Sequence, residues 1–470
     1  MKKAAFIISV LTMLLVQSCT NQDLGSADSA TKLEVSNSMY IERDPSSITS
    51  SDANKVAALF HGGSPTSTRS SVNNEVTEIK DSITGEPLLY IVNYGGNKGF
   101  VLISASKNTT PILAYSDTGH FSLSDDTPTA IFVGNYKKSI RKAQQCTSDS
   151  LRLKYALQWA SFEKTEKPIV SRAISYEMQQ KKDKEIAYQE AQGYKYLGGI
   201  TAAQYYLPQD EYKTFLKEME SCSDPQYDYM EVVQLFTKVI TQNSIGELLQ
   251  TNWHQGYPFN VDAPNKLAGC VPIAVAQITY YHKYPSKYNW SQIGVNPVLN
   301  DAFSYFIKDI RNLCEVKYEA NGTGSNHLKA KKALENLGYS VTIAGTPSED
   351  KLSSQIILKN PTYIQGINSS GKGHAWVCDG YRNIQSISIA TFIPNPNDPR
   401  FELKKKSPNG FIGYDVNLQN TPVSEIGKYF HMNLGWWAGA SNGWYRYDTY
   451  MQNEETNFDK EQTILTIKLK

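Results

Sequence analysis

The chain has 470 residues, of which 40% are hydrophobic, and its 47 Lys and Arg residues nearly balance its 46 Asp and Glu residues. This length exceeds what one compact core usually holds, so we expect two to three domains. The balanced charge gives no reason to expect nucleic acid as a partner, because nucleic-acid-binding chains carry a basic excess.

The first 18 residues predict an export signal, because two lysines precede an apolar stretch that is too short to span a bilayer. Residues 16–19, Val-Gln-Ser-Cys, resemble a bacterial lipobox, in which cleavage leaves Cys19 as the lipid-bearing N-terminus. An ordinary signal peptide cut elsewhere is the alternative. Residues 19–38 are polar and read as a tether. We therefore expect an exported protein attached to the cell envelope through a lipid on Cys19, or released after maturation.

Residues 39–240 predict an α+β unit followed by a more charged helical region. The β-prone runs at 90–94 and 99–104 are separated by Gly-Gly-Asn-Lys, which predicts a hairpin. Helices are expected at 52–60 and 130–145. A further helix is expected at 176–192, where the charges of Lys181 to Glu185 favour a solvated face, with an exposed processing site as the alternative.

The cysteines do not form a recognisable metal site or disulfide scaffold. Apart from Cys19 there are five, an odd number for an exported chain, so at least one thiol is unpaired or pairs between molecules. Wide spacing argues against a zinc site. The pairing of Cys146, Cys222, Cys314 and Cys378 remains open at this point.

Residues 241–470 are expected to form one domain that carries the chemistry. In "GCVPIAVAQITYYHKYP" a glycine precedes Cys270, and a run that includes Ile273 and Gln277 predicts a helix buried nearly all round. Pro272 falls in the first turn, where its missing N–H is harmless. The helix N-terminus favours a thiolate, so Cys270 is a candidate nucleophile. A buried structural cysteine is the alternative.

A thiolate nucleophile needs a proton donor for its leaving group. His374 occurs in "GKGHAWVCDGY", where glycines give way to a strand-like run from Ala375 to Tyr381. This pattern predicts an imidazole at the start of a strand, facing a cleft. The alternative is an ordinary core or surface histidine.

Two further segments supply supporting groups. Gln255, in "TNWHQGYPFN", precedes the cysteine, and its amide could join the Cys270 N–H in an oxyanion hole. Asn433 and Trp436, in "YFHMNLGWWAGASNGWYRYD", could orient or shield the imidazole.

The four segments, in this order, resemble the streptopain and interpain family of papain-like cysteine peptidases. "GFVLISASKNTTPILAYSD" resembles the propeptide of that family. The resemblance implies an α+β papain-like domain at 241–470, with the cysteine helix packed on an antiparallel sheet, after an α+β propeptide at 39–240. It implies Cys270 as nucleophile, His374 as general acid and base, Gln255 as oxyanion donor, and no metal or other cofactor.

The resemblance further implies a zymogen whose propeptide occupies or distorts the cleft, and protein or peptide substrates. Leu434 departs from the family pattern, because a tryptophan usually follows the asparagine. A long insertion between Tyr381 and Phe430 predicts an exposed loop or hairpin near the active-site rim. We therefore expect an exported cysteine endopeptidase. A catalytically silent surface lipoprotein that acts as a binding module, and an amidase or transpeptidase, are the alternatives.

Overall fold

The structure is a computed structural model that describes most of the chain from residue 46 onward. The described residues are 46–60, 74–123, 128–145, 155–156, 158–163, 176–207, 209–263, 265–319, 322–367, 372–415, 424–436, 441–447 and 462–469. The expected export signal, Cys19, the tether and Cys146 lie outside these ranges.

The N-terminal part is an antiparallel meander with one helix on each face. The helix at 50–59 packs on one face of the meander, at residues 90, 92, 101 and 103. The helix at 129–144 packs on the other face, at residues 89, 91, 100 and 102. The predicted hairpin, between residues 87–93 and 100–104, is confirmed, and so are the two predicted helices. The elements are α1 (Ser50–Leu59), β1 (Glu75–Lys80), β2 (Pro87–Asn93), β3 (Phe100–Ser104), β4 (Ile112–Ser116) and α2 (Thr129–Gln144).

A second group of elements, called here the accessory unit, combines residues 176–240 with residues 386–415. Its core joins the two stretches, because Phe215 and Leu235 cluster with Phe392 and Phe401. The elements are α4 (Tyr176–Ala191), β5 (Lys195–Gly198), α5 (Ile200–Tyr206), α6 (Gln209–Cys222), α7 (Tyr229–Val232), β6 (Gln234–Ile245), the 3₁₀ turn η2 (Pro399–Phe401) and β12 (Ile412–Asp415).

The remaining elements surround the candidate site. Helices α8, α9 and α10 share a core with one face of the sheet, whereas α11 shares a core with the other face and with α2. The helices are α8 (Cys270–His282), α9 (Asp301–Leu313), α10 (His327–Asn336) and α11 (Glu349–Ile357). The strands are β7 (Lys317–Glu319), β8 (Gly322–Gly324), β9 (Tyr339–Gly345), β10 (Thr362–Ile367), β11 (Gly373–Phe392), β13 (Ser424–Asn433), β14 (Gly443–Arg446) and β15 (Thr463–Leu469).

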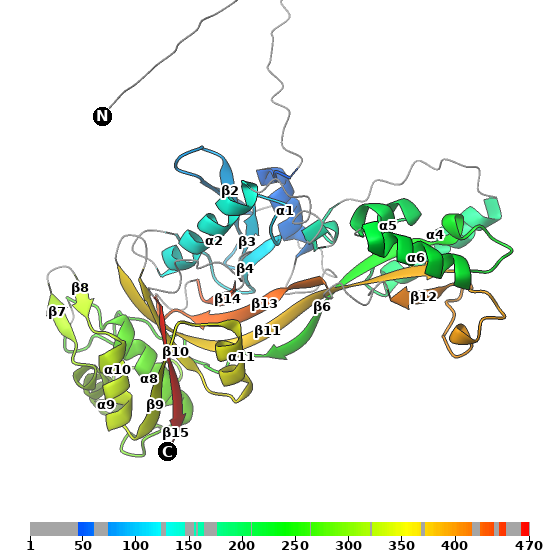
Figure 1. The fold of residues 1–470 in the computed structure, drawn as a ribbon. Helices are drawn as coiled ribbons and strands as arrows, with labels where there is room; N and C mark the ends of the chain where they lie inside the picture. The colour runs from blue at the N-terminus through cyan, green and yellow to red at the C-terminus, as the bar shows by residue number, and fades with distance from the viewer. Residues whose placement is uncertain are drawn as a thin grey trace, which may run out of the picture. The chain divides into compact units, whose positions relative to one another are not determined.

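Among the described residues, thirteen strands form one antiparallel sheet. Its main path runs β1, β2, β3, β4, β14, β13, β11, β10, β15, β9 (Figure 1). The N-terminal meander therefore continues into the C-terminal sheet, through the pairing of β4 with β14. The predicted α+β class, with a cysteine-bearing helix packed on an antiparallel sheet, is confirmed.

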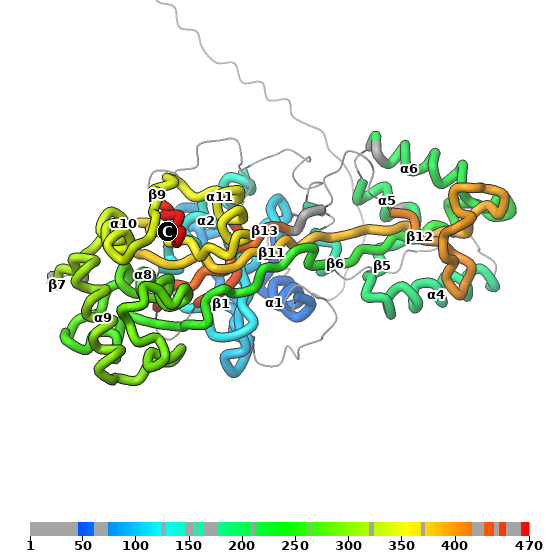
Figure 2. Tube along the Cα trace, turned by 90° about the horizontal axis from the view of Figure 1, so that it is seen from below, coloured from blue at the N-terminus to red at the C-terminus, as the bar shows by residue number. Residues whose placement is uncertain are grey.

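Strand β11 is much longer than the predicted run from Ala375 to Tyr381. One of its edges pairs first with β10 and then with β6, and the other pairs with β13 and then with β12. The ladder of β6 with β11 can be followed in Figure 2. Strand β6 thus crosses residue 240, where the sequence predicts the propeptide boundary.

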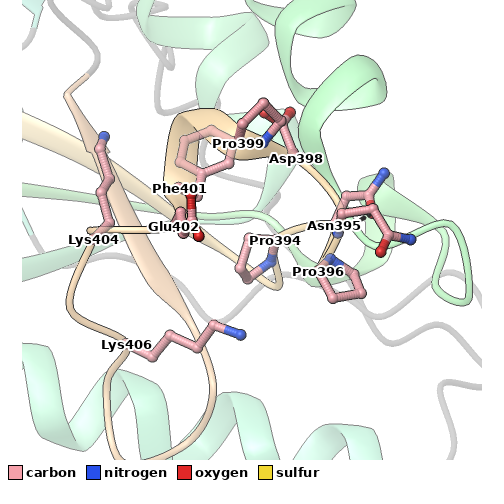
Figure 3. Close-up of a pocket in the computed structure, with 10 residues that line it drawn as sticks. Pro394, Asn395, Pro396, Asp398, Pro399, Phe401, Glu402, Lys404 and Lys406 are labelled. Carbon is pink, nitrogen blue, oxygen red and sulfur yellow. Dashed lines mark hydrogen bonds between the residues drawn. The ribbon is translucent and has the colours of Figure 1, made fainter.

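The position predicted for the insertion after Tyr381 is wrong. At a rise of about 3.3 Å per residue, the far end of β11 at Phe392 lies roughly 60 Å along the strand from His374. The chain beyond Phe392 packs on α6, since Asn395 N donates to the Cys222 carbonyl and the Tyr414 hydroxyl bonds Glu218. Figure 3 shows the prolines and Phe401 of this loop around a hollow of about 560 Å³, which no candidate catalytic residue lines.

The predicted helix over 176–192 is present, but its solvated face includes one buried carboxylate. Glu185 is fully buried and accepts hydrogen bonds from Gln189, Ser407 Oγ and Asn409 Nδ2. A buried carboxylate needs such partners, because burial without them costs on the order of several kcal/mol. Charge alone could not identify this contact, since its partners Ser407 and Asn409 lie more than 200 positions away.

All four described cysteines, Cys222, Cys270, Cys314 and Cys378, are free thiols. Within the described ranges, no helix is both long enough and apolar enough to cross a membrane.

Candidate active site

Cys270 occupies the first position of α8, as predicted. Gly269 precedes it with φ of 100°, a conformation that side chains with a Cβ rarely adopt. Every residue from Val271 to Tyr280 is buried, so the helix is enclosed on all sides. The local sequence therefore explains both the turn before the cysteine and the depth of the helix behind it.

The surroundings of the Cys270 sulfur favour the neutral thiol over the thiolate. Burial raises the pKa of Cys270, and backbone hydrogen bonds from Ala375, Val271 and Cys270 itself lower it by less. The N-terminal amides thus act in the direction that the sequence predicts, but burial outweighs them. The contact with Ala375 places the sulfur beside the main chain next to His374.

His374 lies near the start of β11, as predicted, and its ring is buried. Nε2 lies 2.7 Å from the carbonyl oxygen of Leu434. Trp376 stacks nearly parallel to the ring, with 6.2 Å between ring centroids, and Trp436 meets it edge-on at 5.6 Å. Burial lowers the pKa of His374 to about 4, and the Leu434 hydrogen bond opposes this effect. The imidazole is therefore neutral at ordinary pH.

No hydrogen bond joins the two candidate catalytic side chains, both of which lie in the described part of the chain. Successive side chains of a strand alternate between its faces. Ala375 packs in the core that contains α8 and Cys270, whereas His374 stacks on Trp376, which packs in the core that contains α2. Within the described chain, the hydrogen bonds of the thiol and of the ring do not include each other. The two candidate residues are therefore near each other in the fold without a hydrogen bond between them.

Asn433 and Trp436 lie next to His374 in different ways. Trp436 contacts the ring directly. The Asn433 side chain instead donates to the Thr251 carbonyl at 2.6 Å and accepts from Gln277 at 3.1 Å, and the residue after it supplies the carbonyl to His374. Sequence reasoning missed this main-chain partner, because a carbonyl oxygen leaves no mark in the residue types.

Gln255 is buried. The amide of Ala268 donates to its main-chain carbonyl at 2.8 Å, which ties Gln255 to the residues that lead into Cys270. Its assignment as an oxyanion donor stays a prediction.

The N-terminal meander packs on the histidine side of the sheet. Phe132 of α2 meets Trp376 edge-on at 5.6 Å and lies 4.3 Å from the ring centroid of Tyr445. The same buried cluster includes Leu434, whose carbonyl bonds His374. The face of β11 that carries His374 is therefore covered by the N-terminal part of the chain.

Hydrogen bonds reinforce this packing. Strand β4 pairs with β14, and the hydroxyl of Tyr136 donates to the carbonyls of Leu113 and Arg446, each at 3.0 Å. Buried polar groups of the N-terminal part are thus satisfied by the C-terminal sheet, so separation would leave them without these partners.

Two family models match the chain. The model described as Spi protease inhibitor matches residues 45–140, and that of the Peptidase C10 family matches residues 253–297 and 286–445. The first match covers the meander and the second covers Cys270, His374, Gln255, Asn433 and Trp436.

Two curated relatives are similar in sequence. Thiol protease/hemagglutinin PrtT of Porphyromonas gingivalis is 26% identical over 193 residues, which cover 30% of this chain and 22% of that protein. Streptopain of Streptococcus pyogenes is 21% identical over 337 residues, which cover 62% of this chain and 68% of streptopain. The chain thus matches about a fifth of the length of the first and two thirds of the second.

Among solved structures, a Prevotella intermedia prointerpain A fragment aligns with 84% of this chain and 98% of its own length, at 16% identity and a TM-score of 0.43. The family and sequence matches confirm the resemblance to the streptopain family that the four motifs indicate.

Proposed function

We propose that this chain, whose residues 253–445 belong to the Peptidase C10 family of cysteine peptidases, is the latent proform of an endopeptidase with Cys270 as nucleophile and His374 as general acid and base. The observation that carries the proposal is the contact of the Cys270 thiol with Ala375, the neighbour of His374 in β11. This contact brings a helix-terminal thiol to the strand that carries a neutral imidazole.

The acylation step begins when His374 takes the thiol proton and the sulfur attacks the peptide carbonyl. The oxyanion that forms receives hydrogen bonds from the Cys270 N–H and from Gln255. The imidazolium then gives its proton to the leaving amine, and the C–N bond breaks to leave a thioester.

The deacylation step uses water. His374, neutral again, takes a proton from water as the hydroxyl adds to the thioester, and returns that proton to the sulfur as the C–S bond breaks. The Leu434 carbonyl accepts from Nε2 and so leaves Nδ1 as the basic nitrogen. The products are a carboxylic acid and the free thiol.

Latency follows from the contacts of the N-terminal part. Within the described residues, the Cys270 thiol and the His374 ring share no hydrogen bond while Phe132 packs on Trp376. Removal of residues that include α2 uncovers the face of β11 that carries His374 and so opens this side of the site to a substrate. The N-terminal part is therefore an intramolecular inhibitor of its own peptidase.

The test uses the full chain and its Cys270→Ala variant, incubated under reducing conditions and followed by mass spectrometry. We expect only the wild type to yield a C-terminal fragment that hydrolyses peptides. Cys222→Ala is a matched control, because Cys222 is also a free thiol, yet its sulfur bonds only α6 carbonyls. Equal hydrolysis by wild type and Cys270→Ala would overturn the nucleophile assignment.

If neither the wild type nor Cys270→Ala is cleaved, then either maturation needs an external protease or the chain is a silent binding module. A thiol-directed peptide probe applied after limited trypsin separates these outcomes. Selective labelling of Cys270 supports the peptidase, and no labelling supports the silent module.

We further propose that the chain is exported and carries a lipid on Cys19, because residues 16–19 resemble a lipobox. Lipid attachment is expected to move the wild-type protein into the detergent phase of a phase-separation experiment and to leave Cys19→Ser in the aqueous phase. If the wild type and Cys19→Ser distribute equally between the two phases, the proposed lipid on Cys19 is contradicted.

A further inference from the structure

A side-chain amide, that of Gln277, lies within the mostly apolar middle of α8. Gln277 is 1% exposed and stands two helical turns after Cys270, hence on a similar side of the helix. A buried amide carries two donors and one acceptor oxygen that need partners, because each one left unsatisfied costs about 1–3 kcal/mol.

Gln277 has partners on two other segments. Its Oε1 accepts from Thr251 Oγ1 at 2.7 Å and from the Trp253 amide at 3.4 Å. Its Nε2 donates to Asn433 Oδ1 at 3.1 Å. The helix of the nucleophile is thereby tied to the end of β13, 156 positions away in sequence.

Asn433 in turn connects Gln277 to the main-chain segment whose carbonyl bonds His374. Its Nδ2 donates to the Thr251 carbonyl at 2.6 Å, and Gly435 N donates to its Oδ1 at 3.4 Å. Both Thr251 and Asn433 are at most 2% exposed. The side chain of Asn433 is therefore fixed between Gln277, Thr251 and its own following turn.

The peptide group between these anchors carries the partner of the imidazole. Leu434 N donates to Asn442 Oδ1 at 2.8 Å, and the Leu434 carbonyl lies 2.7 Å from His374 Nε2. Asn442 in turn donates to Asn252 Oδ1 at 3.1 Å. The turn that includes Leu434 is thus held by two side chains, those of Asn433 and Asn442, that bond the 251–253 segment.

We propose that Gln277 is a positioning residue, which fixes the Asn433–Leu434 turn to the nucleophile's helix and so sets the orientation of the His374 ring relative to Cys270. The proposal rests on the proposed function of Cys270 and His374. Gln277 touches no reacting atom in this scheme. Its effect on the reaction passes through Asn433, Leu434 and the imidazole.

Two substitutions break the link in different ways. Gln277→Met keeps the length of the side chain and removes its hydrogen bonds. Gln277→Glu keeps the shape and the acceptor for Thr251 and Trp253, but its carboxyl group has no N–H to donate to Asn433 and, when ionised, has no donor at all. Thr279→Val is the matched control, because Thr279 is equally buried on α8 and its hydroxyl bonds only the carbonyls of Val275 and Ala276.

Kinetics of the matured enzymes form the first readout. We expect Gln277→Met and Gln277→Glu to lower kcat by about tenfold to a hundredfold with little change in KM, because a small misplacement of a catalytic group has effects of this size. Thr279→Val should keep kcat within about twofold. The pH profile of kcat/KM should shift for the Gln277 variants alone, since it reports the free enzyme's titrating groups.

The second readout needs no activity. In the full-length Cys270→Ala chain, the His374 ring resonances and their titration are followed by NMR with and without Gln277→Met. A changed resonance supports the link. An unchanged His374 signal together with an unchanged kcat would overturn the proposal, as would equal losses of kcat and thermal stability in Gln277→Met and Thr279→Val.

A different set of results would show that the proposed function itself is wrong. A matured wild type that neither hydrolyses peptides nor reacts with a thiol probe would refute the peptidase assignment. The NMR comparison in the inactive chain would still report whether Gln277 orients His374.

Discussion

Nε2 of His374 lies 2.7 Å from the carbonyl oxygen of Leu434. A carbonyl oxygen only accepts, so Nε2 carries the hydrogen and a neutral ring keeps Nδ1 free to act as a base. The partner belongs to the main chain, so the leucine that departs from the family pattern supplies the same oxygen that a tryptophan would. The departure at Leu434 is therefore compatible with an oriented histidine.

His374 should leave a signature in the pH dependence of proform stability. Burial lowers its folded pKa to about 4 from 6.5, so between these values the unfolded chain binds more protons. Its contribution to stability is therefore complete above about pH 6.5 and is lost as the pH falls toward about 4. The melting temperature of Cys270→Ala should fall more steeply over this window than that of Cys270→Ala/His374→Phe. If the melting temperatures of the two variants change with pH in parallel, the lowered pKa of His374 is contradicted.

His431 and Asp379 form a buried pair, with Nδ1 and Oδ1 2.6 Å apart. Asp379 also accepts from the Leu249 amide at 3.0 Å. Breaking such a pair leaves a buried charge, so Asp379→Asn should lower the free energy of unfolding by about 3–5 kcal/mol in urea titrations. The exposed pair of Lys331 and Glu335 gives the control, and Glu335→Gln should cost below about 1 kcal/mol.

The same pair predicts a pH effect of opposite sign to that of His374. Burial disfavours the charged imidazole of His431, but the charge and hydrogen bond of Asp379, with Glu247, outweigh it and raise the pKa of His431. The contribution of the charged His431 to the free energy of unfolding is therefore complete below about pH 6.5, and it is lost as the pH rises through the folded pKa of His431. Asp379→Asn should cost more at about pH 5.5 than at about pH 8. A cost independent of pH would exclude an ionised pair.

Gly443 should control how tightly the N-terminal part docks. A Cβ at this position would lie 2.7 Å from the Tyr115 carbonyl oxygen and 3.0 Å from a ring carbon of Phe100. Gly443→Ala should therefore destabilise the Cys270→Ala proform by about 1–3 kcal/mol and speed the maturation of the active chain. Hydrolysis by the matured enzyme should not change.

Gly413→Ala is the control for this substitution, because a Cβ there would meet only Ile389 Cδ1 at 3.8 Å. Both proforms are compared by thermal melting and by the rate at which the C-terminal fragment appears. Equal behaviour of the two variants would show that β4 does not depend on close approach to β14.

The maturation cut should fall outside β6. Residues 234–241 and 243–245 of this strand each lie opposite a residue of β11 in an antiparallel ladder, and proteases prefer exposed loops. We therefore expect the new N-terminus of the mature fragment outside residues 234–245, as determined by mass spectrometry. An N-terminus inside this range would mean that β6 detaches before cleavage.

Local sequence was sufficient for several elements. Gly269, Pro272 and the apolar run behind Cys270 predict the buried helix because each acts through its own turn or through helical periodicity. The hairpin of β2 and β3 follows from two apolar runs and a short glycine-containing turn. The order of four motifs was enough to indicate the family.

Tertiary structure decided the arrangement of the site. The sequence predicts Cys270 and His374 as catalytic residues, but the ring stacks on Trp376 of the N-terminal core because the alternation of β11 places the two side chains on one face. From the sequence, Gln277 is only one of the buried positions of its helix. The fold places Asn433 of β13 within 3.1 Å of its amide nitrogen. The insertion after Tyr381 became a strand extension because β6 and β12 pair with it. Helix starts and turns depend on adjacent residues, whereas ladders and buried polar links depend on segments that only folding brings together.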